Sequence, residues 1–215
     1  MLKVIGINGS PRKGWNTHMV VEKALEGARD AGAITKLYHI SDFKIQPCIS
    51  CLSCKKTPES SGKCAIKDDL TPLLQEIKTA DALVIGSPIY WSQISSYLHT
   101  ALERMWFSNY RYTSEPSSLP KPIKTLMIYT MNVGPEMAKD FHYPTLMDEI
   151  KRINEYVLRG KSDRFCVYNT QQVKDYSKYA ITVFDIPEKL RRRKEVFPKE
   201  LEKAYQLGRE LATKD

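Results

Sequence analysis

The chain alternates between continuous apolar runs and segments in which apolar residues recur every three or four positions. Apolar runs bounded by turn residues are typical of strands buried on both faces of a parallel sheet. We expect such strands over residues 2–7, 34–40, 82–86, 123–129 and 164–168. The helical spacing between and after these runs predicts amphipathic helices, including a helical C-terminal tail at 187–215.

This order of elements predicts an α/β protein with a doubly wound parallel sheet. Strands that alternate with helices are expected to lie parallel and to be joined by right-handed crossovers. Five strands at this spacing fit the flavodoxin-like order 2-1-3-4-5, with helices on both faces and a ligand site at the carboxyl ends of strands 1 and 3. The length of 215 residues and the 42% hydrophobic content predict one domain over residues 1–215, with a cysteine-rich loop at 43–66.

The loop after the first strand carries groups that bind anions. It offers hydroxyl, amide and guanidinium side chains at the start of a helix, where free N–H groups also gather, on Ser10, Arg12, Asn16 and Thr17. Neither GxxxxGKS/T nor GxGxxG is present, so a monophosphate is a better expectation than a triphosphate or a dinucleotide. The alternative interpretation is a simple capped turn, because Asn and Thr are ordinary N-caps.

Two further loops could contribute to the same site. The third strand ends in residues 88–91, Pro-Ile-Tyr-Trp, which could form the wall that a planar heteroaromatic ring requires. Tyr90 and Trp91 could equally be amphipathic residues at the edge of the core. Thr130 and Asn132 follow the fourth strand and could provide a third contact with the ring. A ring that carries one phosphate makes FMN the obvious candidate.

Charge and hydropathy narrow the class of protein. The net charge is +8, and residues 191–194 (Arg-Arg-Arg-Lys) account for half of it, most simply as a solvated helix face. No aromatic-studded basic groove accompanies that run, so we expect no nucleic-acid partner. No apolar run is long enough for a membrane span, and the N-terminus begins directly in a strand. We therefore expect a cytoplasmic protein with reduced cysteines.

Four of the five cysteines lie in the loop at 43–66. Cys48, Cys51 and Cys54 follow the tight CxxCxxC spacing used for iron–sulfur clusters, and Cys64 could supply a fourth thiolate. A zinc site with four thiolates and four unligated thiols are the alternatives. Cys166 lies in a strand pattern and is expected to be a small buried hydrophobe.

Taken together, these motifs resemble the NADPH-dependent FMN reductase-like flavoproteins, and within that group the iron–sulfur flavoproteins. The resemblance rests on four segments. They are the loop at 8–17, which we call the phosphate loop, the loop at 43–66, which we call the cysteine loop, the Asp68-Asp69 pair, and the Gly-Ser-Pro-Ile-Tyr-Trp segment at 86–91. It implies a flavodoxin-like fold, FMN, a 4Fe-4S cluster, and a homodimer or homotetramer. The nine residues between Cys54 and Cys64 depart from the usual iron–sulfur flavoprotein spacing, although a longer loop costs little entropy.

The resemblance also assigns roles and an activity. Ser10, Arg12, Asn16 and Thr17 would hold the phosphate, and residues 88–91 would line the isoalloxazine ring. Electrons would come from NAD(P)H or ferredoxin and pass to an acceptor that the sequence does not name. The chemistry belongs to the flavin, so we assign no catalytic side chain. The alternatives are a flavin-only quinone, nitro or azo reductase and a non-catalytic FMN electron carrier. The aromatic residues Tyr90, Trp91 and Trp106, with the 107–120 loop, favour a subunit interface near the flavin.

Overall fold

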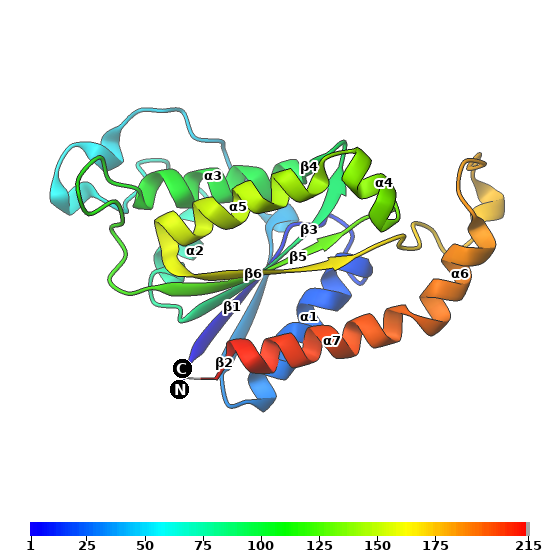
Figure 1. Ribbon diagram of the computed structural model, residues 1–215. Helices are drawn as coiled ribbons and strands as arrows, with labels where there is room; N and C mark the ends of the chain where they lie inside the picture. The colour runs from blue at the N-terminus through cyan, green and yellow to red at the C-terminus, as the bar shows by residue number, and fades with distance from the viewer. Residues whose placement is uncertain (214–215) are drawn as a thin grey trace.

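A twisted sheet runs through the middle of the molecule, as seen in the computed structural model, which describes residues 1–213 (Figure 1). Its parallel strands follow the order β2-β1-β3-β5-β6. Their bounds are β1 (Lys3–Asn8), β2 (Ile34–His39), β3 (Ala82–Tyr90), β5 (Ile123–Thr130) and β6 (Arg159–Val167). The predicted flavodoxin-like order is therefore confirmed for these parallel strands.

Helices cover both faces of the sheet. The helices α1 (Asn16–Asp30) and α7 (Phe197–Leu211) lie on one face, while α6 (Ile186–Glu195) extends past the strand ends (Figure 1). The other face carries α2 (Leu70–Ile77), α3 (Ser96–Asn109), α4 (Pro135–Asp140) and α5 (Tyr143–Leu158). Short 3-10 turns complete the connections: η1 (Ile40–Asp42), η2 (Ser53–Lys55), η3 (Pro58–Ser60) and η4 (Tyr176–Lys178).

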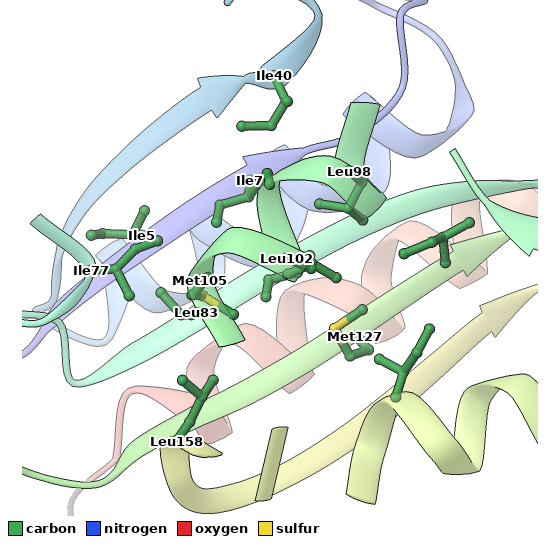
Figure 2. Close-up of a cluster of buried hydrophobic side chains, with 14 of the residues drawn as sticks. Ile5, Ile7, Ile40, Ile77, Leu83, Leu98, Leu102, Met105, Met127 and Leu158 are labelled. Carbon is green, nitrogen blue, oxygen red and sulfur yellow. The ribbon is translucent and has the colours of Figure 1, made fainter. Parts of the chain in front are cut away.

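The strands are apolar throughout because each one supplies two hydrophobic cores. Successive side chains of a strand point to opposite faces of the sheet. Ile5 and Leu83 therefore pack toward α2, α3 and α5 (Figure 2), whereas Val4 and Val84 pack toward α1 and α7. Within residues 1–213, no helix combines the length and the apolar character that a membrane crossing needs.

Two glycines allow α7 to lie directly against α1. A Cβ atom on Gly208 would stand 1.8 Å from the backbone oxygen of Ala24, and one on Gly27 would stand 2.0 Å from that of Tyr205. No side chain fits at such distances, so only glycine permits this approach. The contact fixes the C-terminal part of the chain, including α6, to the first βα unit.

The structure corrects three details of the predicted elements. A short antiparallel strand, β4 (Gln93–Ile94), pairs with the end of β3 as a sixth strand among the described residues. Two residues are too few to produce a periodic pattern. Strand β6 begins at Arg159 rather than at residue 164, and the helical tail at 187–215 divides at Val196 into α6 and α7. The last two residues of that tail, 214 and 215, lie outside the described part of the chain.

Candidate functional site

The loop between β1 and α1 is held in place by its own side chains. The Asn8 amide donates to the Ser10 carbonyl at 3.2 Å and accepts from the Ser10 N–H at 3.1 Å. The Ser10 hydroxyl accepts from the Arg12 N–H at 3.1 Å. The Gly9 N–H donates to the carbonyl of Gly86 on β3 at 2.8 Å. These contacts hold the loop against the carboxyl end of the neighbouring strand.

A pocket opens at the carboxyl ends of β1, β3 and β5, where the strand order reverses. Such a position is where doubly wound sheets bind ligands. The lining residues come from four loops: Ser10, Arg12, Trp15, Asn16, Thr17, Pro88, Ile89, Tyr90, Thr130, Met131, Asn132, Thr170 and Gln172. Of the ten residues predicted to bind the cofactor, nine are in this set. The structure therefore brings them together, and their contacts with a cofactor remain a prediction.

Trp91 is the predicted residue that does not line this pocket. Its side chain is 98% exposed, and its backbone has a φ of 48° in the turn between β3 and β4. The turn reverses the chain immediately after Tyr90, so the indole extends into solvent. Tyr90 keeps a place in the pocket, and burial raises the pKa of its phenol although Arg12 partly opposes this rise.

The loop after β5 is joined to the phosphate loop and to the C-terminal region. The Thr130 and Thr17 hydroxyls are 2.7 Å apart and hydrogen-bonded. The Asn132 carbonyl accepts from Lys189 of α6 at 2.7 Å. The Asn132 side-chain oxygen is buried without a hydrogen-bond partner among residues 1–213. An unpaired buried acceptor on a residue that lines the pocket fits a ligand that carries an N–H group.

The C-terminal region supplies contacts that the sequence did not predict. Arg12 donates to the Gln172 carbonyl at 2.6 Å, and Asn16 donates to the Gln171 carbonyl at 2.7 Å. Arg193 of α6 donates to the Asn16 side-chain oxygen at 2.9 Å. The run at 191–194 is therefore not simply a solvated face, because Arg193 is half-buried. One feature of the sequence could have indicated this contact. Arg193 follows Lys189 by four positions, so the two side chains share one face of a helix.

Positive charge concentrates where an anion is expected. The Trp15 ring has the Arg12 guanidinium 4.5 Å and the Arg193 guanidinium 5.7 Å from its centroid. The Trp15 indole N–H is buried and lacks an acceptor within the described residues. Burial lowers the pKa of Arg193, and burial with the nearby Arg192 charge lowers the pKa of Lys189 to about 8. The Arg12 guanidinium and the unpaired indole N–H, both from residues that line the pocket, fit a bound phosphate group.

The four cysteines of the 43–66 loop line one small cavity together with Arg104. Cys54 is buried, which raises the pKa of its thiol, whereas a hydrogen bond with Ser53 lowers the pKa of the exposed Cys51 thiol. Among residues 1–213, no three Cys, His, Asp or Glu side chains are grouped closely enough to bind one metal ion. Four thiols around one cavity are nevertheless the donor set that an iron–sulfur cluster uses.

The comparisons with known proteins agree with this geometry. The family model described as NADPH-dependent FMN reductase matches residues 2–119. The chain therefore belongs to this family, and FMN is the cofactor that the family assigns to it. An iron–sulfur flavoprotein of Methanocaldococcus jannaschii is 39% identical over 103 residues, which are 48% of this chain and 51% of that protein. The chain thus matches only about half the length of this curated relative.

Solved structures share the fold over nearly the whole chain. The NAD(P)H:quinone oxidoreductase of Methanothermobacter marburgensis has a TM-score of 0.71 and 16% identity, covering 100% of this chain and 98% of that one. An FMN-dependent NADH-azoreductase of Bacillus anthracis, in complex with FMN, has a TM-score of 0.65 and 15% identity. The match covers 98% of this chain and 100% of that one. At these identities the similarity establishes the fold alone.

Proposed function

We propose that the protein is an FMN-dependent oxidoreductase that takes electrons from NAD(P)H or ferredoxin. The observation that carries this proposal is the pocket at the strand switch point, where the phosphate loop, the 88–90 segment and Asn132 converge. A basic, donor-rich end adjoins an end with rigid backbone and an aromatic ring. That arrangement suits a heteroaromatic monophosphate, and family membership supports FMN as that ligand.

Each part of the pocket has a distinct task in this proposal. When bound, FMN supplies the redox chemistry, because its ring exchanges hydride or electrons with substrates. Ser10, Arg12, Asn16 and Thr17 would hold the phosphate through hydroxyl, guanidinium and amide donors. Tyr90 would line the ring site and limit the contact of the ring with water. The Asn132 side-chain oxygen would accept a hydrogen bond from an N–H group of the ring.

The cysteine loop decides between two versions of this activity. In an iron–sulfur flavoprotein, Cys48, Cys51, Cys54 and Cys64 would hold a 4Fe-4S cluster, which would supply single-electron transfer. The common cavity of these four residues and the M. jannaschii relative favour this version. The alternative is a flavin-only reductase of quinone, nitro or azo compounds, which the names of the structural neighbours favour. The excess of basic residues argues against a simple acidic flavodoxin-type carrier.

We further propose that the protein is a cytoplasmic homodimer or homotetramer. An apolar groove of about 360 Å³ runs between α3 and α5. It is lined by His99, Glu103, Trp106, Phe107, Tyr110, Ile153, Tyr156 and Val157. These aromatic residues are partly or largely exposed in the single chain, and aromatic residues are enriched in the cores of subunit interfaces. Light scattering with FMN bound tests this point, and a monomer at micromolar concentration would contradict it.

The activity is tested on protein purified without oxygen. We expect about one FMN per chain, and flavin bands that bleach when NADPH or NADH is added. Turnover with quinone, nitro and azo acceptors then separates the enzyme from a carrier. The contents of iron, zinc and acid-labile sulfide distinguish an iron–sulfur flavoprotein from a flavin-only reductase. Protein that binds no FMN after reconstitution would refute the proposed function.

A further inference from the structure

Helix α6 presents two cations on one face toward the candidate site. Lys189 is 1% exposed and donates to the Asn132 carbonyl at 2.7 Å and to the Asn169 side-chain oxygen at 2.5 Å. Arg193 lies four positions later and donates to Asn16. Residues four apart share one face of a helix. One face of α6 thus reaches both the 130–134 loop and the phosphate loop.

The contact with Arg193 determines which way the Asn16 amide faces. An asparagine side chain carries one oxygen acceptor and one NH₂ donor, whereas a guanidinium can only donate. Arg193 Nη1 therefore pairs with Asn16 Oδ1, at 2.9 Å, and the NH₂ group donates one of its two N–H groups to the Gln171 carbonyl at 2.7 Å. A side chain that lines an anion site must present N–H groups, because an oxygen there would repel phosphate. Because Arg193 occupies the Asn16 oxygen, the second N–H of the NH₂ group is the donor that Asn16 can still offer to an anion.

Arg193 is itself held rigidly enough for this task. Its guanidinium lies 4.3 Å from the Phe197 ring centroid and 3.2 Å from the Met19 sulfur, which belong to α7 and α1. It therefore occupies the junction between three helices rather than open solvent. Helix α6 also lies beside the start of α1 in the fold (Figure 1). This helix falls outside the segment 2–119 that the family model matches.

We propose that Arg193 is a positioning residue for phosphate recognition, which gives the site its preference for FMN over riboflavin by orienting Asn16. The proposal rests on the proposed function, in which the 8–17 loop binds the FMN phosphate. It adds a residue from the C-terminal helix to a site otherwise formed by the sheet loops. It also makes the phosphate, rather than the ring, the part of the ligand that depends on α6.

Titration of the apoprotein with FMN and with riboflavin, followed by flavin fluorescence, tests this role. We expect Arg193→Met to raise the Kd for FMN roughly tenfold, the scale of a lost hydrogen bond to a charged group, while the Kd for riboflavin changes by less than about twofold. Arg193→Lys keeps a pure donor and should recover most of the FMN affinity. Arg191→Met is the matched control, because Arg191 is exposed and pairs with Glu188 and Glu195.

A double-mutant cycle separates orientation from a direct charge effect. If Arg193 acts through Asn16, Arg193→Met should cause no further loss of FMN affinity in an Asn16→Ala background. A loss that persists there, or one shared equally by FMN and riboflavin, would overturn the proposal. So would an unchanged FMN affinity in Arg193→Met. Riboflavin binding shows that each variant retains a folded ring site. Failure of the wild-type protein to bind FMN would instead refute the proposed function.

Discussion

Arg104 of α3 and Asp68 form an ion pair buried beneath the cysteine loop, with side-chain exposures of 0% and 8%. Asp68 also accepts from the Gln46 N–H at 3.0 Å, and Arg104 donates to the carbonyls of Gln46 and Ile66 at 3.2 and 3.3 Å. Gln46 precedes the first cysteine of the loop and Ile66 follows the last. The pair therefore fixes the points at which the loop leaves and rejoins the fold.

Breaking this pair should destabilise the protein strongly. We expect Arg104→Ala to lower the free energy of unfolding by about 3–5 kcal/mol, because Asp68 would remain buried without its partner. Burial alone would raise the pKa of Asp68, and the bond from Arg104 is the main force lowering it. Urea denaturation measures the change. Arg152→Ala, in an exposed pair with Glu149, should change the free energy of unfolding by no more than about 0.5 kcal/mol. Equal effects of the two substitutions would contradict this account.

The metal content should depend on the cysteine loop and not on the flavin site. If the loop holds a cluster, anaerobic protein should contain about four irons per chain. Cys51→Ser should then remove the iron and leave FMN bound, because the phosphate loop is a separate segment. Elemental analysis and the flavin spectrum measure both. Cys166→Ser, a change outside the loop, should keep the iron. Stoichiometric zinc, or no metal with four titratable thiols, would leave the flavin-only enzyme.

Arg12 should contribute to phosphate binding specifically. Arg12→Ala is expected to weaken the binding free energy of FMN by a few kcal/mol at most, about the value of one charge-assisted hydrogen bond. It should leave riboflavin binding nearly unchanged. Calorimetric titration with both flavins measures this. Lys13 is exposed and paired with Asp42, so Lys13→Ala serves as the neighbouring control. Wild-type protein that binds FMN and riboflavin equally well would remove the basis for assigning the phosphate to this loop.

The glycine contact between α1 and α7 should tolerate no side chain. Gly208→Ala should lower the free energy of unfolding by about 1–3 kcal/mol through overpacking, in spite of alanine's better helix propensity. Gly134 has open space around its Cα, so Gly134→Ala should change stability by about 1 kcal/mol or less. Thermal and urea unfolding measure both variants. If Gly208→Ala is as stable as the wild type, the two helices do not approach each other this closely.

Lys189 should make stability increase with pH in the alkaline range. Its pKa falls to about 8 in the folded protein, from 10.5 in an unperturbed lysine. Between these values the unfolded chain binds the additional proton, so raising the pH favours folding, with a slope of up to about 1.4 kcal/mol per pH unit. We expect Lys189→Met to lose this contribution. Urea unfolding of both proteins from pH 8 to pH 10 tests it, and identical slopes would contradict the assignment.

The sequence predicted the sheet because each buried strand leaves a continuous apolar run. It also predicted that the loop after β1 lies at the switch point of the sheet, and residues of this loop do line the pocket there, while their binding of phosphate remains a prediction. The end of α3 was less clear: the helix continues to Asn109, although the segment from 107 onward resembles a polar loop. The Asp68-Asp69 pair, one of the motifs that carry the family resemblance, immediately precedes α2. Asp68 does accept from the Leu70 N–H, but it is also the partner of Arg104.

The contacts that α6 makes with the site could not be predicted from the sequence, for a physical reason. Lys189 and Arg193 belong to a strongly charged helix, and charges on such a helix are usually solvated. Only the tertiary contact between α7 and α1 brings that helix to the strand ends, and the contact depends on glycines that leave no hydrophobic signal. Trp91 shows the opposite difference, because it was expected at the site and does not line the pocket. Its residue type suited a ring wall, but the turn after Tyr90 directs it into solvent.

The pocket is assembled from segments that lie far apart in the sequence, and this gives its formation an order in time. Residues 8–17 are synthesised well before Gln172 and Arg193, because more than 150 residues separate them along the chain. During synthesis the phosphate loop is therefore complete long before the groups that contact it from α6 and the 170–172 segment. We expect the nascent chain to bind its cofactor only after α6 has emerged and folded against α1, so that cofactor loading reports the docking of this helix.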